Sequence, residues 1–228
     1  MKEKDLVIFD IDRTIYDGSI GQDFIIELVN EGLVSPKILA SLSIELLEYE
    51  LDIQAYNKTV KDALQILSNE LINCDVKAVK EVAKKVLILN HYKFYDYIFE
   101  IPQLFKDFDY TLLSLEPQIL VEEISEYIKI PNIICNEFKY NQHKMLGNNF
   151  IETNKLNLLE KSKFNERKII AAFGDSENDL GILNKANLKF VINPTPNLIK
   201  LITTNQDFII SNSKDVFENF KKKIINFV

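Results

Sequence analysis

The sequence contains little cysteine and histidine, and this scarcity limits the kinds of metal site that the chain can build. Among the 228 residues only Cys74 and Cys135 are cysteines, only His91 and His143 are histidines, and no CxxC pair occurs. The usual zinc sites, which use four such ligands at short spacing, are therefore excluded. Two reduced, buried thiols are the ordinary expectation for cysteines of this kind.

Basic charge and long hydrophobic runs are also lacking. The chain has 27 lysines and arginines against 34 acidic residues, a net charge of −7, and an isoelectric point near 5.0. This balance argues against nucleic acid or an anionic membrane as the main partner. No apolar run reaches 18 residues, and no basic start precedes a long apolar segment. We expect a cytoplasmic protein that acts on a small molecule, and the sequence leaves its oligomeric state open.

Short apolar runs alternate with helical patterns along most of the chain. The runs expected to form strands are residues 6–9, 110–114, 133–135, 168–173, 189–192 and 208–210. Helical spacing separates most of them, and residues 136–150 suggest a loop or a small hairpin. Strands that alternate with helices predict a parallel sheet covered on both faces, a Rossmann-like α/β fold.

One long helical block interrupts this alternation directly after the first strand. We predict an α/β core formed by residues 1–16 and 106–228, with an inserted all-helical cap over residues 17–105. An insertion at this point would lie over the carboxyl ends of the strands, where open α/β sheets bind ligands. The cap would therefore act as a lid.

The first strand ends in an unusual way. The run Leu6–Phe9 is followed at once by Asp10 and Asp12, and then by the hydroxyl of Thr14. Burying an ionised carboxylate without a partner costs several kcal/mol, roughly estimated. Two carboxylates so close together therefore favour a bound cation.

Further polar residues occur where other strands end or helices begin: Ser114, Lys155, Asp175 and Asp179. If the sheet forms as predicted, these side chains converge on one crevice with Asp10 and Asp12. Oxygen ligands of this kind suit Mg²⁺. A lysine and a hydroxyl beside such a metal could bind a phosphate group, and a carboxylate facing that phosphate could be its nucleophile.

Each signal taken alone has an ordinary explanation. A calcium loop starting at Asp10 conflicts with Ile15 and Gly21 at its sixth and twelfth positions. Residues 175–179 alone could be a helix cap, Ser114 a structural residue, and Lys155 a solvated one. Lys161 is an alternative to Lys155, because helix boundaries are uncertain by a few residues. The occurrence of all the motifs in order carries the inference.

This ordered set resembles the haloacid dehalogenase-like superfamily, and within it the phosphoserine phosphatase-like branch with a helical cap after the first motif. Asp10-Ile11-Asp12-Arg13-Thr14 matches the first motif, and Leu112-Leu113-Ser114 the second. Lys155, with Leu159 four residues later, fits the third best. Gly174-Asp175-Ser176-Glu177-Asn178-Asp179 matches the fourth. The resemblance covers nearly the whole chain, and its first and fourth motifs are the specific ones.

The resemblance implies a division of roles. Asp10 would attack phosphorus, and Asp12 would protonate the leaving oxygen and later deprotonate the hydrolytic water. The metal ligands would be Asp10, the backbone carbonyl of Asp12, and Asp175. Ser114 and Lys155 would bind the phosphate.

Three further residues have supporting roles in the same resemblance. Asp179 would orient the metal shell or the phosphate-binding lysine, Asn178 would contact water on the metal or the substrate, and Thr14 completes the first motif. The implied activity is a Mg²⁺-dependent phosphatase that hydrolyses a small phosphate monoester through an aspartyl-phosphate. Alternatives are phosphoryl transfer through the same intermediate and a non-catalytic regulatory protein on this scaffold.

The predicted cap departs from the phosphoserine phosphatase pattern. No arginine lies between Thr14 and Ser114, and Ser19 stands where that pattern has an acid. A lysine lacks the planar fork with which arginine binds a carboxylate, so phosphoserine is not the expected substrate. Acidic residues near the start of the cap, Asp17, Asp23 and Glu27, could favour a phosphate ester that carries an amine or a polyol. Arg13 adds a cation beside the nucleophile, with its role left open.

Overall fold

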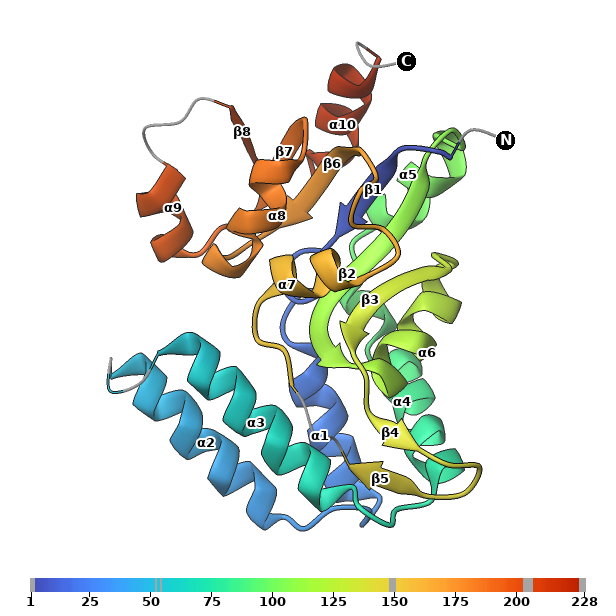
Figure 1. Ribbon diagram of the computed structural model, residues 1–228, viewed down its shortest axis with the longest axis vertical. Coiled ribbons are helices and arrows are strands. Elements are labelled where there is room, and N and C mark those ends of the chain that lie inside the picture. The colour runs from blue at the N-terminus through green and yellow to red at the C-terminus, as the bar shows by residue number, and fades with distance from the viewer. Residues whose placement is uncertain (1–2, 52, 54, 148–150, 203–206, 226–228) are drawn as a thin grey trace.

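The computed structural model describes residues 3–51, 53, 55–147, 151–202 and 207–225, and it is built around a six-stranded parallel sheet (Figure 1). The strands are β1 (Leu6–Phe9), β2 (Asp109–Pro117), β3 (Asn132–Asn136), β6 (Ile169–Gly174), β7 (Leu188–Ile192) and β8 (Phe208–Ser211). Their order in the sheet is β3-β2-β1-β6-β7-β8, and every pairing is parallel. The predicted Rossmann-like α/β fold is confirmed.

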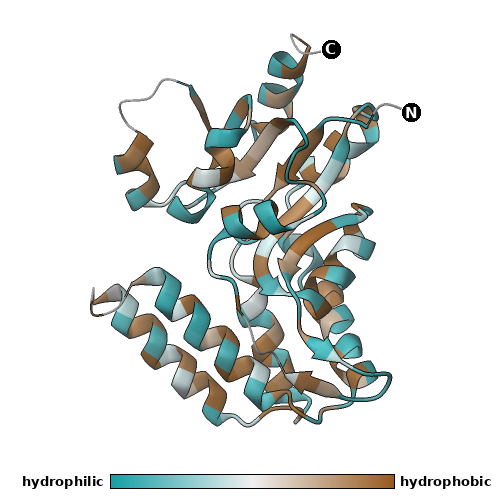
Figure 2. Ribbon diagram, in the orientation of Figure 1, coloured by the Kyte–Doolittle hydropathy of each residue, from teal (hydrophilic) through white to brown (hydrophobic). Residues whose placement is uncertain are grey.

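Alternate residues of the central strands pack into two separate hydrophobic clusters, one on each face of the sheet. Val7 and Phe9 of β1 belong to one cluster, whereas Leu6 and Ile8 belong to the other. This division follows from the period of two in an extended strand. Because both faces are covered, the central strands are continuously apolar, as their mainly brown colour in Figure 2 shows.

Different helices cover the two faces. The first cluster includes residues of α5 (Tyr97–Leu104), α6 (Gln118–Ile128) and α10 (Val216–Ile224). The second includes residues of α7 (Lys155–Lys161), α8 (Leu180–Lys185) and α9 (Pro196–Ile202). A short 3₁₀ turn, η2 (Glu177–Asp179), precedes α8. The sheet is thus the middle of three layers.

The insertion after β1 forms a separate helical unit at the carboxyl ends of the strands (Figure 1). It contains α1 (Ile20–Asn30), α2 (Lys37–Glu50), α3 (Tyr56–Glu70), α4 (Val76–Leu89) and the short turn η1 (His91–Lys93). Helices α2 and α3 pack together as a hairpin, and α4 packs against both α1 and the core helix α6. Among the described residues no helix is both long enough and apolar enough to cross a membrane.

A small hairpin joins this helical unit from outside it. Strands β4 (Lys139–Tyr140) and β5 (Met145–Gly147) pair in antiparallel fashion, which confirms the hairpin option for this region; residues 148–150 lie outside the described part. Met145 exchanges backbone hydrogen bonds with the turn between α3 and α4: Asn73 N donates to Met145 O at 2.9 Å, and Met145 N donates to Cys74 O at 3.0 Å. The cap therefore has a β element attached to it.

Helix α5 lies within residues 17–105 but packs against the core. Phe105, which follows it, meets Phe220 of α10 with 5.3 Å between the ring centroids. Tyr97 lies 6.5 Å from Phe9 and 6.3 Å from Phe173. The division of the chain at residues 17 and 105 stays a prediction, and α5 is the segment on which its second boundary depends.

The strand expected to end at Ser114 is longer than the sequence indicated. Strand β2 continues to Pro117, so Ser114 lies within it. Its pairing with β3 is regular up to Leu113 and resumes only at Pro117, a register irregularity. An apolar run does not reveal such a bulge, because the bulge depends on the partner strand.

The aromatic centre of the first cluster gives a test of the packing. The ring of Phe190 is fully buried and stacks 4.6 Å from Phe173. Replacing it in Phe190→Ala should lower the free energy of unfolding by about 3–5 kcal/mol, because a large cavity replaces the ring. Urea denaturation would measure this loss.

Tyr92→Ala is the matched control, since Tyr92 is 71% exposed. It should change the same free energy by no more than about 0.5 kcal/mol. Equal losses in the two variants would contradict the assignment of Phe190 to the core.

Candidate active site

Asp10 stands at the carboxyl end of β1, at the centre of the sheet. Phe9 pairs with Leu112 of β2 and with Phe173 of β6, so the residues that follow these three strands meet at one edge. The Asp10 backbone N–H donates to Phe173 O at 3.0 Å. Its carboxylate is buried and accepts a hydrogen bond from Thr14 Oγ1 at Oδ2, 3.0 Å long. Both Asp10 and Thr14 of the first motif are therefore part of one fixed turn.

Lys155 reaches this carboxylate from the first residue of α7. Asn154 caps the helix, with Oδ1 accepting from Leu156 N at 2.9 Å and Asn157 N at 3.2 Å. The buried ammonium of Lys155 donates to Asp10 Oδ1 and, at 2.7 Å, to Asp179 Oδ1. One cation thus holds two acidic motifs together.

Lys161, the alternative considered above, lies at the other end of α7. Its Nζ pairs with Glu152 Oε2 at 2.7 Å, and its side chain is 59% exposed. The geometry thus favours Lys155 as the lysine that faces Asp10.

The segment that leads into α7 is tied to the core by one buried amide. Asn136 Nδ2 donates to Leu115 O at 2.7 Å and to Glu152 O at 3.0 Å. In return, Glu152 N donates to Asn136 Oδ1 at 2.8 Å. These bonds fix the chain three residues before Lys155.

The fourth motif forms a tight turn after β6. Asp179 Oδ2 accepts hydrogen bonds from Asp175 N, Ser176 N and Ser176 Oγ, each 3.1 Å long. A β-carbon on Gly174 would lie only 2.3 Å from Asp179 Cβ. Glycine is required there because the acidic turn folds directly over it.

Three buried carboxylates converge at this edge of the sheet. Asp10, Asp175 and Asp179 each present one oxygen, and these oxygens lie within 4.8 Å of one another. An all-oxygen donor set of this kind fits a hard divalent cation such as Mg²⁺. The carboxylate of Asp179 joins the set here, whereas the sequence suggested a supporting role for it.

The acidity of these carboxyl groups reflects how little water reaches them. Burial raises the pKa of Asp10 to about 7, although the Lys155 ammonium opposes the rise. Burial, together with the neighbouring Asp10 and Asp179 carboxylates, raises the pKa of Asp175 to about 8. Burial alone would lower the pKa of Lys155, but Asp10 and Asp179 raise it above its ordinary value. The cluster holds more negative charge than its own cations offset, so a bound divalent cation fits it.

The side chain of Asp12 points toward the cap rather than toward these three carboxylates. Its Oδ1 accepts a 2.7 Å hydrogen bond from Ile20 N, at the start of α1. Burial, followed by the nearby Glu116 carboxylate, raises the pKa of Asp12 well above its usual range. The two acids of the first motif therefore occupy different environments, as two different chemical roles require.

Ser114 and Asn178 complete the set of predicted residues. Ser114 is buried, two residues beyond the partner of Phe9, and its Oγ accepts from Glu116 N at 3.2 Å. The side-chain nitrogen of Asn178 is buried and has no hydrogen-bond partner among the described residues. A buried donor without an acceptor is consistent with a ligand oxygen at that position.

Two residues near the site were missed by the sequence reasoning. The Glu116 carboxylate is close enough to raise the pKa of Asp12, and a β-carbon on Gly21 would lie 2.3 Å from its Oε1. Glu116 lies in β2 two residues after Ser114, within the stretch where the pairing with β3 is irregular, so simple strand alternation does not predict its position. Tyr56 begins α3, and burial raises its pKa, with further electrostatic effects from Lys155 and Asp10.

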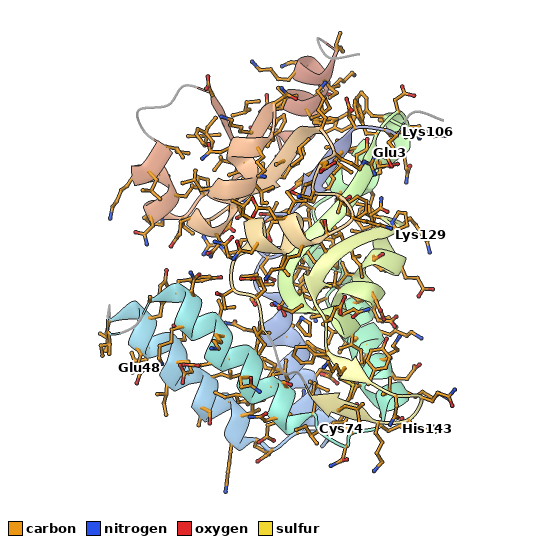
Figure 3. The ribbon with its side chains drawn as sticks, viewed as in Figure 1. Glu3, Glu48, Cys74, Lys106, Lys129 and His143 are labelled. Carbon is orange, nitrogen blue, oxygen red and sulfur yellow. The ribbon has the colours of Figure 1, made fainter. Side chains whose placement is uncertain are left out.

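Tyr56 brings the tip of the α2–α3 hairpin over the site. Its ring meets Tyr49 edge to face, with centroids 5.5 Å apart, and Tyr49 OH donates to Glu177 Oε1 at 3.3 Å. By contrast, Cys74 and His143 lie by the β4–β5 hairpin at the bottom of Figure 3, away from α7. These contacts make the cap one wall of the site, with no contribution from either Cys74 or His143.

The two lysines of α7 give a direct test of this geometry. Lys155→Met would leave Asp10 and Asp179 buried without their ammonium, which should lower the free energy of unfolding by about 3–5 kcal/mol. Lys161→Met removes an ion pair whose lysine is 59% exposed, while Glu152 keeps its hydrogen bonds to Thr153 N and Asn154 N, so it should cost about 0–1 kcal/mol. Urea denaturation in EDTA would measure both, and equal losses would contradict the central position of Lys155.

Comparisons with known proteins agree with the fold and show the family of the chain. Residues 7–184 match the family model of haloacid dehalogenase-like hydrolases. A search of curated proteins finds no match. Three solved structures illustrate the likeness of the fold.

The first is a protein with unknown function from Bordetella pertussis Tohama I. It is 13% identical in sequence, the alignment covers 92% of this chain and 99% of that chain, and the TM-score is 0.73. A phosphoserine phosphohydrolase-like protein from Francisella tularensis subsp. tularensis SCHU S4 has 19% identity, 92% and 95% coverage and a TM-score of 0.59. A phospho-aspartyl intermediate analogue of phosphoserine phosphatase has 17% identity, 96% and 99% coverage and a TM-score of 0.58. These likenesses confirm the fold expected from the phosphoserine phosphatase-like branch. Because the family match spans most of the sequence, this chain belongs to the haloacid dehalogenase-like hydrolase family.

Proposed function

We propose that the protein is a Mg²⁺-dependent phosphatase that hydrolyses a small phosphate monoester through an aspartyl-phosphate on Asp10. The observation that carries the proposal is the buried cluster of Asp10, Asp175 and Asp179, with Lys155 bonded to two of its members. Such a site combines a nucleophilic carboxylate with positive charge for the phosphoryl oxygens. Asp12, turned to the cap side, supplies a second acid outside the cluster.

The chemistry divides between the two acids of the first motif. In the first step an Asp10 oxygen attacks phosphorus, the bond from phosphorus to the ester oxygen breaks, and Asp12 gives its proton to that oxygen. In the second step Asp12 takes a proton from water, the water oxygen attacks phosphorus, and the bond to Asp10 breaks. The products are the alcohol and inorganic phosphate.

The residues around Asp10 prepare it for this role. Thr14 Oγ1 and Lys155 Nζ each donate to one of its oxygens, which fixes the orientation of the carboxylate. Lys155, Ser114 and the unpartnered amide of Asn178 would bind phosphoryl oxygens. Mg²⁺ held by Asp10, Asp175, Asp179 and the backbone carbonyl of Asp12 would supply charge that offsets the negative phosphoryl group.

The cap narrows the choice of substrate. Asp23 pairs with Lys93 at 2.7 Å, and Glu27 pairs with Lys85. Asp17 accepts from Tyr95 OH at 3.1 Å. These three acids, which the sequence suggested for an amine-bearing or polyol substrate, already have partners. Because no arginine lies between Thr14 and Ser114, we propose that the substrate is a small ester other than phosphoserine. Its leaving group would contact Tyr56, which lies near Lys155 and Asp10.

Asp10→Asn tests the nucleophile. The variant should lose hydrolysis of p-nitrophenyl phosphate with Mg²⁺ by at least about 10³-fold, because an amide cannot form the aspartyl-phosphate. Mass spectrometry of acid-quenched wild-type enzyme should find one added phosphoryl group, which the variant lacks.

Asp62→Asn is the matched control, because Asp62 pairs with Lys58 on the surface of α3. It should retain wild-type turnover. Robust activity in Asp10→Asn would contradict the nucleophile assignment.

Asp12→Asn tests the acid and base. Hydrolysis of an alkyl phosphate should fall by roughly 10²–10⁴-fold, because the alkoxide leaves poorly without a proton. With p-nitrophenyl phosphate, whose leaving group needs little help, the variant should show a burst of one p-nitrophenolate per enzyme, followed by slow turnover.

Stopped-flow absorbance would measure that burst. Equal losses on both substrates without a burst would contradict a role for Asp12 in both steps. A phosphorylated product formed from a supplied alcohol would identify phosphoryl transfer instead of hydrolysis. A chain that binds Mg²⁺ but turns over no phosphate ester would favour a regulatory role.

A further inference from the structure

Arg13 has an unusual backbone conformation between Asp12 and Thr14. Its φ of 57° lies in the left-handed region, which side chains with a β-carbon rarely adopt. Its N–H donates to Gly18 O at 3.1 Å, which closes the turn after the nucleophile. Non-glycine residues that keep such a conformation often serve a function through the side chain.

That side chain reaches into the acidic cluster from solvent. Arg13 Nε lies 3.1 Å from Asp175 Oδ2; the Arg13 side chain is 53% exposed and the Asp175 side chain only 7%. Among the described residues, Arg13 is the cation that forms an ion pair with Asp175. Lys155 pairs with the other two carboxylates, Asp10 and Asp179.

The two cations differ in how easily they can leave. Lys155 is 7% exposed and bonded to two buried acids, so moving it away would leave both uncompensated. Among the residues that the structure describes, Arg13 forms one ion pair, with Asp175, and half of its side chain is already in water. Its guanidinium can turn into solvent while Asp175 accepts another cation in its place.

We propose that Arg13 is an exchangeable counter-ion of the metal site. Its guanidinium neutralises Asp175 when no divalent cation is bound and gives up that carboxylate when one binds. Arg13 therefore competes with Mg²⁺ and lowers the affinity of the site for it. This inference rests on the Mg²⁺ site of the proposed function and does not depend on turnover.

The test is the Mg²⁺ affinity of the intact protein, measured by isothermal titration calorimetry without substrate. Arg13→Gln keeps a β-carbon at the same φ and a long polar side chain but removes the charge. It should bind Mg²⁺ roughly three- to tenfold more tightly than the wild type, the size expected for losing a half-exposed competing ion pair. Arg13→Lys, which restores a cation, should return the affinity toward the wild-type value.

Two further variants serve as controls, one for backbone strain at Arg13 and one for the loss of an arginine elsewhere. Arg13→Gly removes the charge and relieves the unfavourable φ. It should therefore have the same Mg²⁺ affinity as Arg13→Gln but unfold at a higher urea concentration than Arg13→Gln when both are measured in EDTA. Arg167→Gln removes the chain's other arginine, which pairs with Asp109 at 2.7 Å, and should leave the affinity unchanged.

The outcomes are distinguishable. Equal Mg²⁺ affinities in the wild type and in Arg13→Gln would overturn the competition and leave the proposed phosphatase intact. Tighter binding in Arg13→Gly alone would also overturn it, because strain and not charge would then set the affinity. An absence of Mg²⁺ binding in every variant would overturn the metal site and this inference together.

Discussion

The buried ammonium of Lys155 is the interaction on which the site depends. It lies between Asp10, which follows β1, and Asp179, which follows β6. Without this cation the turns after two neighbouring strands would bring uncompensated carboxylates into a space that water hardly reaches. The same charge that permits the fold is the charge a phosphate would meet. Stability and the proposed phosphate binding therefore depend on the same residue.

The parallel sheet makes that interaction possible. Because β1, β2 and β6 run in the same direction and Phe9 at the end of β1 pairs with both neighbours, the segments that follow these strands emerge at one edge. The cap then closes the edge from the other side through Tyr56 and the contact of Tyr49 with Glu177. The buried acidic cluster thus comes from the core, and a separate helical unit covers it.

The sequence predicted the strands and the acidic motifs because both can be recognised from short contiguous stretches of residues. A buried parallel strand is a short apolar run, and the residues after it follow from the run's end. The position of Glu116 was not predictable in this way, since it depends on the bulge between β2 and β3 and on the space over Gly21. The position of Tyr56 depends on how the α2–α3 hairpin is set against the core. Nor does the local pattern reveal the ion pair of the cap residue Asp23 with Lys93, because the two are distant in sequence.

The amide of Asn136 has a mechanical consequence. The cap is linked to the core by its two chain connections and also by the β4–β5 hairpin, which is bonded to the turn after α3. This hairpin lies in the part of the chain that leads from β3 to α7. Asn136 binds Leu115 and Glu152 across the base of that segment, so the end of β3 and the residues before α7 are joined independently of the hairpin. The position of Lys155, three residues further on, therefore rests on these core hydrogen bonds as well as on the hairpin.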